Sequence, residues 1–130
     1  MAAMGDTVLR LMPLIEDVSR AQRSITLFTD LPLPALSASV EAYPIASLAE
    51  ALDWPDFMAI DLPLQRLGEL RAMFGLTDGS RLPFPAQVLI TTPMPCAGLA
   101  GCGVCAVPGR RGWKLACEDG PVFELDGLKW

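Results

Sequence analysis

Four cysteines carry most of the chemistry available to this chain of 130 residues. Cys96, Cys102, Cys105 and Cys117 all lie in the last 35 residues, with the spacing C-x5-C-x2-C-x11-C. The chain contains no histidine, which excludes Ser-His and Cys-His catalytic pairs, mixed Cys/His zinc sites and Rieske-type ligation. Thiolate and carboxylate chemistry therefore remain.

The cysteine spacing is close to the C-x4-C-x2-C…C arrangement by which plant-type ferredoxins ligate a [2Fe–2S] cluster. Two tetrahedral irons need four thiolate sulfurs in one small volume, and a tight loop followed by a returning strand can supply them. The glycines of the loop permit positive φ angles, so that backbone N–H groups can turn toward the sulfurs. These glycines are Gly98, Gly101 and Gly103, and the apolar neighbours that would limit water access are Met94, Leu99 and Val104.

Three other interpretations of the cysteines stay open at this point. Structural zinc is equally tetrahedral, but most zinc folds use two C-x2-C knuckles and only Cys102 and Cys105 form one. Two disulfides would need an oxidising compartment. A thioredoxin-type pair at Cys102 and Cys105 would leave Cys96 and Cys117 without a role.

Residues 1–92 alternate between strand and helix patterns. We predict buried strands at 25–29, 57–60 and 87–92, with a shorter one around 40–45. Helices are predicted from Pro13 to about residue 22, from a capping box at Ser47 and Glu50, and from Pro63 to Gly75. This alternation is typical of an α/β fold with a small Rossmann-like parallel sheet and flanking helices.

The C-terminal region follows a different pattern. After a turn at 108–111, we predict a strand at 112–116 that delivers Cys117, and a closing strand at 122–125 in a second hairpin. The chain therefore divides into a truncated Rossmann-like scaffold at 1–92 and a cysteine-rich β-hairpin subdomain at 93–130. The aromatic residues Trp113, Phe123 and Trp130 are assigned to the core in preference to a partner face.

Asp30 and Asp61 each follow a predicted strand, at the edge where parallel sheets bind ligands. The glycine fingerprint G-x-G-x-x-G that cradles a pyrophosphate is missing from residues 1–92. We therefore interpret both aspartates as residues that end strands and begin turns, rather than as a nucleotide site.

Composition limits the partners. The 15 acidic residues exceed the 10 basic ones, and the longest basic run is Arg110–Arg111, so nucleic acid is a poor partner. The N-terminal residues show neither a secretory apolar segment nor a membrane span. We expect a cytoplasmic protein with reduced thiols and no membrane contact; association of two copies is left open.

The run MPCAGLAGCGVCAV…GWKLACEDGPVF, over residues 94–123, resembles the iron–sulfur domain of the electron-transfer subunit of dihydroorotate dehydrogenase B and of related ferredoxin-reductase-like subunits. The string Asp-Gly-Pro-Val-Phe at 119–123 after the fourth cysteine is a specific part of this signal. Residues 7–92 resemble, more faintly, the later portion of the nucleotide-binding domain of that family. The resemblance implies that the four cysteines ligate a [2Fe–2S] cluster, although five residues instead of four separate the first two.

The same resemblance does not extend to flavin or nicotinamide binding, because the FAD-binding barrel and the glycine-rich first turn have no counterpart here. We therefore expect a non-catalytic electron-transfer component of an oxidoreductase, which passes single electrons between a flavoprotein and an acceptor. The alternative is a zinc-stabilised structural or interaction module derived from a reductase subunit.

Overall fold

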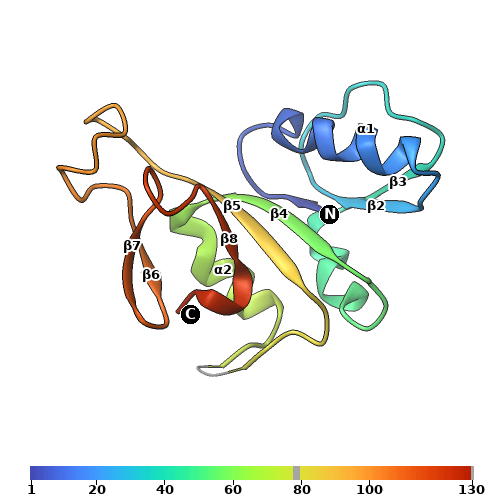
Figure 1. The fold of residues 1–130 in the computed structure, drawn as a ribbon. Coiled ribbons are helices and arrows are strands. Elements are labelled where there is room, and N and C mark those ends of the chain that lie inside the picture. Colours follow the sequence, from blue (N-terminus) through green and yellow to red (C-terminus); the bar gives the residue numbers. More distant parts are fainter. Residues whose placement is uncertain (78–79, 130) are drawn as a thin grey trace.

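The computed structural model describes residues 1–77 and 80–129. These residues form a six-stranded sheet with the order β3-β2-β1-β4-β5-β8, in which β8 alone is antiparallel to its neighbour (Figure 1). The strands are β1 (Ala2–Ala3), β2 (Ile25–Phe28), β3 (Val40–Tyr43), β4 (Met58–Pro63), β5 (Ala86–Thr91) and β8 (Val122–Glu124). The position of β1 between β2 and β4 is that of a doubly wound α/β fold, which confirms the predicted fold class.

Helices cover both faces of the parallel strands (Figure 1). On one face, the 3₁₀ turn Leu9–Leu11 leads into α1 (Met12–Arg20), whose Ile15 packs with Leu27 and Ala59. On the other face lie the 3₁₀ segment Ile45–Ala51 and α2 (Leu67–Met73), which begins from the 3₁₀ turn Leu64–Arg66. Alternate residues of β4 face opposite layers, as the period of a strand requires.

Proline and glycine mark the helix ends as predicted. Pro13 occupies the first turn of α1, where its missing N–H costs nothing. Pro63 ends β4 directly before the next helical segment, and Gly75, with φ of +61°, follows α2. The predicted strands at 25–29, 40–45 and 87–92 are confirmed to within two residues at their ends.

Two local predictions for residues 1–92 are wrong, and one strand was missed. The helix expected from Ser47 begins at Ile45 as a 3₁₀ segment whose N-cap residue is Pro44, which makes no side-chain hydrogen bond, so the capping box does not form. The strand expected at 57–60 continues to Pro63, which places Asp61 inside β4. The central strand β1 was not predicted, because two alanines carry neither periodicity nor β-branched side chains.

The C-terminal segment is built onto the same sheet. Strands β6 (Ala106–Gly109) and β7 (Gly112–Leu115) form an antiparallel hairpin, so Pro108 and Gly109 belong to a strand and not to the turn we predicted. The predicted closing strand forms as β8, but it pairs with β5 of the main sheet instead of making a second hairpin. Side chains of this segment share one core cluster with the sheet: Val107, Ala116, Phe123, Leu125 and Leu128.

The aromatic side chains differ from the expectation. Phe123 is 5% exposed, which confirms its core assignment, whereas Trp113 is 75% exposed, so its core assignment is wrong. Trp130 lies outside the described residues. No helix in the described parts of the chain is both long enough and apolar enough to cross a membrane.

The shared core predicts that Phe123→Ala destabilises the sheet and the cysteine-rich segment together. Phe123 faces Val88 across the β5–β8 pair, and loss of its buried ring is expected to cost about 3–5 kcal/mol of unfolding free energy. Val122→Ala, on the same strand but 48% exposed, is the matched control and should cost less than about 0.5 kcal/mol. Urea unfolding followed by fluorescence and circular dichroism measures both; an unchanged midpoint for F123A would contradict the shared core.

Candidate metal centre

The loop of residues 93–105 carries three of the four predicted ligands and leaves the sheet at the end of β5, toward the upper left of Figure 1. Two local turns shape it: the Ala97 N–H donates to the Met94 carbonyl at 3.0 Å, and the Leu99 N–H to the Cys96 carbonyl at 3.2 Å. The fourth ligand, Cys117, follows β7. The β6–β7 hairpin therefore connects Cys105, just before β6, with Cys117, just after β7.

Cys105 and Cys117 form the inner pair. Their Sγ atoms lie 3.3 Å apart, and the Ala116 N–H donates to the Cys105 carbonyl at 3.0 Å, which fixes the two segments side by side. Cys105 is 1% exposed and belongs to the core cluster, with Cys117 packed against it. This pair is thus held by the folded body of the protein.

The electrostatics of the inner pair favour one thiolate. The N–H and thiol groups of Cys117, with the Ala116 N–H, lower the pKa of Cys105. The pKa of Cys117 is raised, first because its thiol is the hydrogen-bond partner of Cys105 and then by burial. The surroundings of Cys105 thus favour its thiolate, whereas those of Cys117 favour its protonated form.

Cys96 and Cys102 form the outer pair on the loop. A hydrogen bond from Cys102 is the largest cause that lowers the pKa of Cys96 to about 7, and the N–H groups of Gly98, Leu99 and Gly101 add to it. Cys102 is exposed and Cys96 is half-buried. The loop thus prepares a thiolate near neutral pH without burying it.

The inner and outer cysteine pairs interact with each other, but they remain two separate pairs. The Ala100 N–H, from the loop, donates to Cys117, and the negative charge of a Cys96 thiolate raises the pKa of Cys117. Within residues 1–77 and 80–129, no set of three or more Cys, Asp or Glu side chains is placed to hold one metal ion. The structure therefore brings the four thiols together as two pairs.

The predicted positive φ angles are confirmed at two of the three loop glycines. Gly98 and Gly103 have φ of +85° and +69°, but Gly101 is not in this region. Two alanines take the left-handed conformation instead: Ala97 at +52° and Ala100 at +55°. For L-residues this conformation costs about 1–2 kcal/mol each, so the loop holds strain at the residues next to its sulfur-directed N–H groups.

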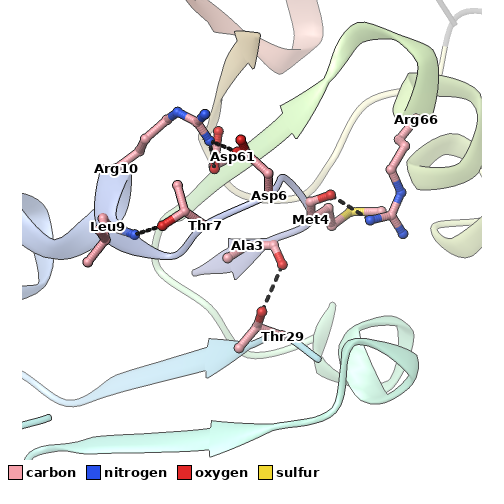
Figure 2. A network of polar contacts seen from close by, with 9 residues as sticks. All are labelled: Ala3, Met4, Asp6, Thr7, Leu9, Arg10, Thr29, Asp61 and Arg66. Atoms are coloured by element: carbon pink, nitrogen blue, oxygen red, sulfur yellow. Dashed lines mark hydrogen bonds and ion pairs between the residues drawn. The ribbon is translucent and has the colours of Figure 1, made fainter. Parts of the chain in front are cut away.

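A second polar feature, which sequence analysis missed, lies at the carboxyl ends of the parallel strands (Figure 2). The Arg10 guanidinium contacts Asp6 at 2.6 Å and the fully buried Asp61 at 3.2 Å, and the other Asp61 oxygen has no hydrogen-bond partner among the described residues. Burial raises the pKa of Asp61, and Arg10 opposes that shift. A Cβ on Gly5 would lie 2.9 Å from an Asp61 oxygen, so only glycine fits beside this carboxylate.

Asp6 and Arg10 line a crevice of about 510 Å³ whose walls come from the ends of β1, β4 and β5, and Asp61 is buried behind Arg10. The lining residues are Met4, Gly5, Asp6, Arg10, Pro63, Gln65, Arg66, Thr91, Thr92 and Pro93. Arg66 is engaged with Glu69 and with the Met4 carbonyl. The interpretation of Asp61 as a turn residue is therefore wrong. Asp30 lies in the bend after β2, and its carboxylate accepts from the Ile45 N–H, 15 residues further along the chain, at 3.2 Å.

Comparison with solved structures shows the fold. A chain from the structure titled as an NADH-dependent reduced ferredoxin-NADP oxidoreductase, described for flavin-based electron bifurcation, superposes with a TM-score of 0.64 at 18% sequence identity. The match covers 99% of this chain and 53% of that one, so the present chain spans about half of its length. A search of curated proteins found no match.

Comparison with protein families identifies the cysteine-rich segment. Residues 92–129 match the model of the iron–sulfur cluster binding domain of dihydroorotate dehydrogenase B. The matched range begins where β5 has just ended and includes all four cysteines, the β6–β7 hairpin and β8. The resemblance seen in the sequence is thus confirmed: the segment 92–129 is similar to the iron–sulfur cluster binding domain of dihydroorotate dehydrogenase B.

Proposed function

We propose that this chain binds a [2Fe–2S] cluster through Cys96, Cys102, Cys105 and Cys117 and passes single electrons between a flavoprotein and an acceptor. The observation that carries the proposal is the grouping of the thiols into two pairs, with Cys105 and Cys117 at 3.3 Å. A cluster with two irons needs two thiolates at each iron, whereas one structural zinc ion needs four around a single point. The family match to an iron–sulfur domain supports the same choice.

The two cysteine pairs suggest which ligands would bind each of the two irons. Cys105 and Cys117 would hold the inner iron against the core, and Cys96 and Cys102 would hold the outer iron on the exposed loop. Backbone N–H groups already directed at the sulfurs would stabilise their negative charge. A bound cluster supplies reversible one-electron chemistry, and the chain supplies its ligands, its hydrogen bonds and its access to solvent.

The rest of the chain serves this site. Residues 1–92 would act as the scaffold and residues 93–130 as the cluster-binding part, divided by role although their side chains share a core. Electron transfer needs close approach and not a substrate pocket, which is why we propose no catalytic residue. A cytoplasmic setting would keep the four thiols reduced until a cluster is inserted.

A flavoprotein partner is proposed from two sources. Residues 92–129 match an iron–sulfur cluster binding domain of dihydroorotate dehydrogenase B, and the structural neighbour was described for flavin-based electron bifurcation. The Arg10–Asp61 pair in the crevice adds a third consideration, because two carboxylates beside a single bridging guanidinium disfavour a pyrophosphate. These observations support a flavoprotein as the donor or the acceptor of the electron.

Metal and sulfide analysis tests the cluster directly. Protein purified without oxygen should be red-brown, contain about two irons and about two acid-labile sulfides per chain, and give an electron paramagnetic resonance signal after reduction. A colourless protein with one zinc per chain would instead establish the zinc-stabilised module. Flavin that copurifies with the chain would contradict the placement of the flavin on a partner.

Serine variants test the ligands. Cys102→Ser should lower the iron content at least about tenfold, and because Cys102 is exposed this loss reports ligation and not folding. Cys105→Ser should lose the iron and also about 1–3 kcal/mol of stability, since a hydroxyl is then buried in the core. Val104→Ser, at a half-exposed neighbour, is the control and should keep full iron content. Iron retained in C102S and C105S would end the ligand assignment.

The outer pair can be tested in the metal-free chain. Alkylation of Cys96 by iodoacetamide should rise with pH around its pKa of about 7, because only the thiolate reacts. Cys102→Ala removes the largest cause of the lowered pKa, so the profile should shift to higher pH. Cys105→Ala lies in the other pair and should leave the profile in place. Mass spectrometry of the labelled peptide gives each profile, and an identical profile in C102A would contradict the pairing.

A further inference from the structure

The β6–β7 hairpin carries an unusual charge for this chain. Residues 106–115, here called the cationic hairpin, contain Arg110, Arg111 and Lys114 and no acidic residue. Residues 1–92 hold 11 acidic and 6 basic side chains, so the net negative charge of the protein is concentrated in the scaffold. The hairpin is therefore a local positive surface on a negatively charged molecule.

The charges of the cationic hairpin are not neutralised within the described residues. Arg111 and Lys114 are exposed and make no ion pair there, whereas Arg10, Arg20 and Arg66 of the scaffold all do. Arg110 donates to the Ser80 carbonyl at 2.6 Å, and its N–H donates to the Gly127 carbonyl at 3.0 Å, which anchors the turn. A rigid turn thus presents cations that are available to a partner.

An exposed tryptophan lies among these cations. Trp113 pairs with Pro108 across the hairpin and is 75% exposed, and Leu99 on the cysteine loop, at 82%, is the only described large apolar side chain that is more exposed. Both belong to the segment with the proposed cluster ligands. Tryptophan and arginine are the residues most enriched at the energetic centres of protein interfaces.

The position of β7 leaves this surface accessible. Leu128 and Lys129 bond to β6 on one side of the hairpin, and β7 is the outermost strand on the other side (Figure 1). Basic side chains on an edge strand also prevent strand-to-strand aggregation, which is a purely structural role for Lys114. That role does not account for Trp113, because an exposed ring promotes association instead of preventing it.

We propose that the cationic hairpin docks the redox partner, and that this partner is an acidic protein whose one-electron cofactor is ringed by carboxylates. This inference rests on the proposed function, and it names the chemistry of the partner. Cys105 and Cys117 flank the hairpin, so docking on it brings the partner to the inner pair of ligands. Unpaired cations steer the encounter, and Trp113 provides the apolar contact.

Carbodiimide cross-linking tests the contact, because it joins a lysine amine to a partner carboxylate without a spacer. The chain has two lysines, Lys114 and Lys129, so mass spectrometry distinguishes the hairpin from the C-terminal end. The probe is a flavodoxin of acidic pI, incubated with the iron-loaded chain; basic cytochrome c is the mismatched probe. We expect a Lys114 cross-link to flavodoxin that is lost in Lys114→Arg and declines between about 10 mM and about 500 mM salt.

Electron-transfer kinetics test the consequence. In stopped-flow measurements, Arg111→Gln with Lys114→Gln should slow reduction of flavodoxin by the reduced chain about fivefold or more at low salt, and Trp113→Ala should slow it at all salt concentrations. Arg20→Gln with Arg23→Gln removes the same charge from the scaffold and should change the rate by less than about twofold.

The outcomes separate the two proposals. A red-brown chain that cross-links to flavodoxin only through Lys129 or its amino terminus, or whose rate falls equally in the scaffold control, would overturn the docking surface and leave the electron-transfer function intact. A colourless chain without iron would overturn the proposed function and the docking inference with it.

Discussion

The candidate site depends on holding thiols in close pairs with no covalent bond between them, Cys105 with Cys117 at 3.3 Å and Cys96 with Cys102. Thiolates repel one another: the pKa of Cys117 is raised first by its hydrogen bond with the Cys105 thiol, then by burial, and after these by the negative charges of Cys105 and Cys96. The chain offsets the repulsion with backbone N–H groups, which lower the pKa of Cys96 and Cys105. A bound cluster, as proposed above, would supply the remaining compensation if all four cysteines became thiolates.

The two pairs are held by different means. Cys105 belongs to the hydrophobic core, and the β6–β7 hairpin brings Cys117 back to it, so the inner pair is fixed by the same burial that stabilises the sheet. The outer pair depends on a loop with left-handed alanines at Ala97 and Ala100, whose strain must be offset by contacts the loop makes. Metal binding would therefore stabilise the loop more than the fold.

Much of the scaffold followed from local sequence. Pro13 and Gly75 mark helix ends because their φ preferences act within one turn, and strands such as β2 and β5 show β-branched or apolar runs. Tertiary context decided the rest: β1 has only two alanines, and β8 pairs with β5 because Phe123 completes a core formed by distant residues. Asp61 could not be read as buried from its sequence neighbours, since its partner Arg10 lies 51 positions away.

For the candidate metal centre, the spacing of the cysteines predicted a cluster, but it did not predict which cysteines would lie together as pairs. The short C-x2-C spacing of Cys102 and Cys105 suggests that these two act together, yet the structure places each with a different partner. The reason is the reversal of the loop at Ala100, whose N–H reaches Cys117, and it depends on φ values that alanine rarely adopts. We expected a positive φ angle at Gly101 because it is a glycine, but the positive φ angle occurs at the preceding residue, Ala100.

The charge distribution makes the molecule electrostatically asymmetric. The scaffold carries the whole net charge of −5, while residues 93–130 have four acidic and four basic side chains and the cationic hairpin has basic ones only. An acidic protein that approaches is repelled by residues 1–92 and attracted by the hairpin, so the field orients it before contact. The crevice beside Arg10 contributes little to this field, because Asp6 and Asp61 oppose its guanidinium at 2.6 and 3.2 Å. The fold thus separates a self-neutralised end of the sheet from a positively charged hairpin tip, which β6 and β7 connect to Cys105 and Cys117 at the hairpin base.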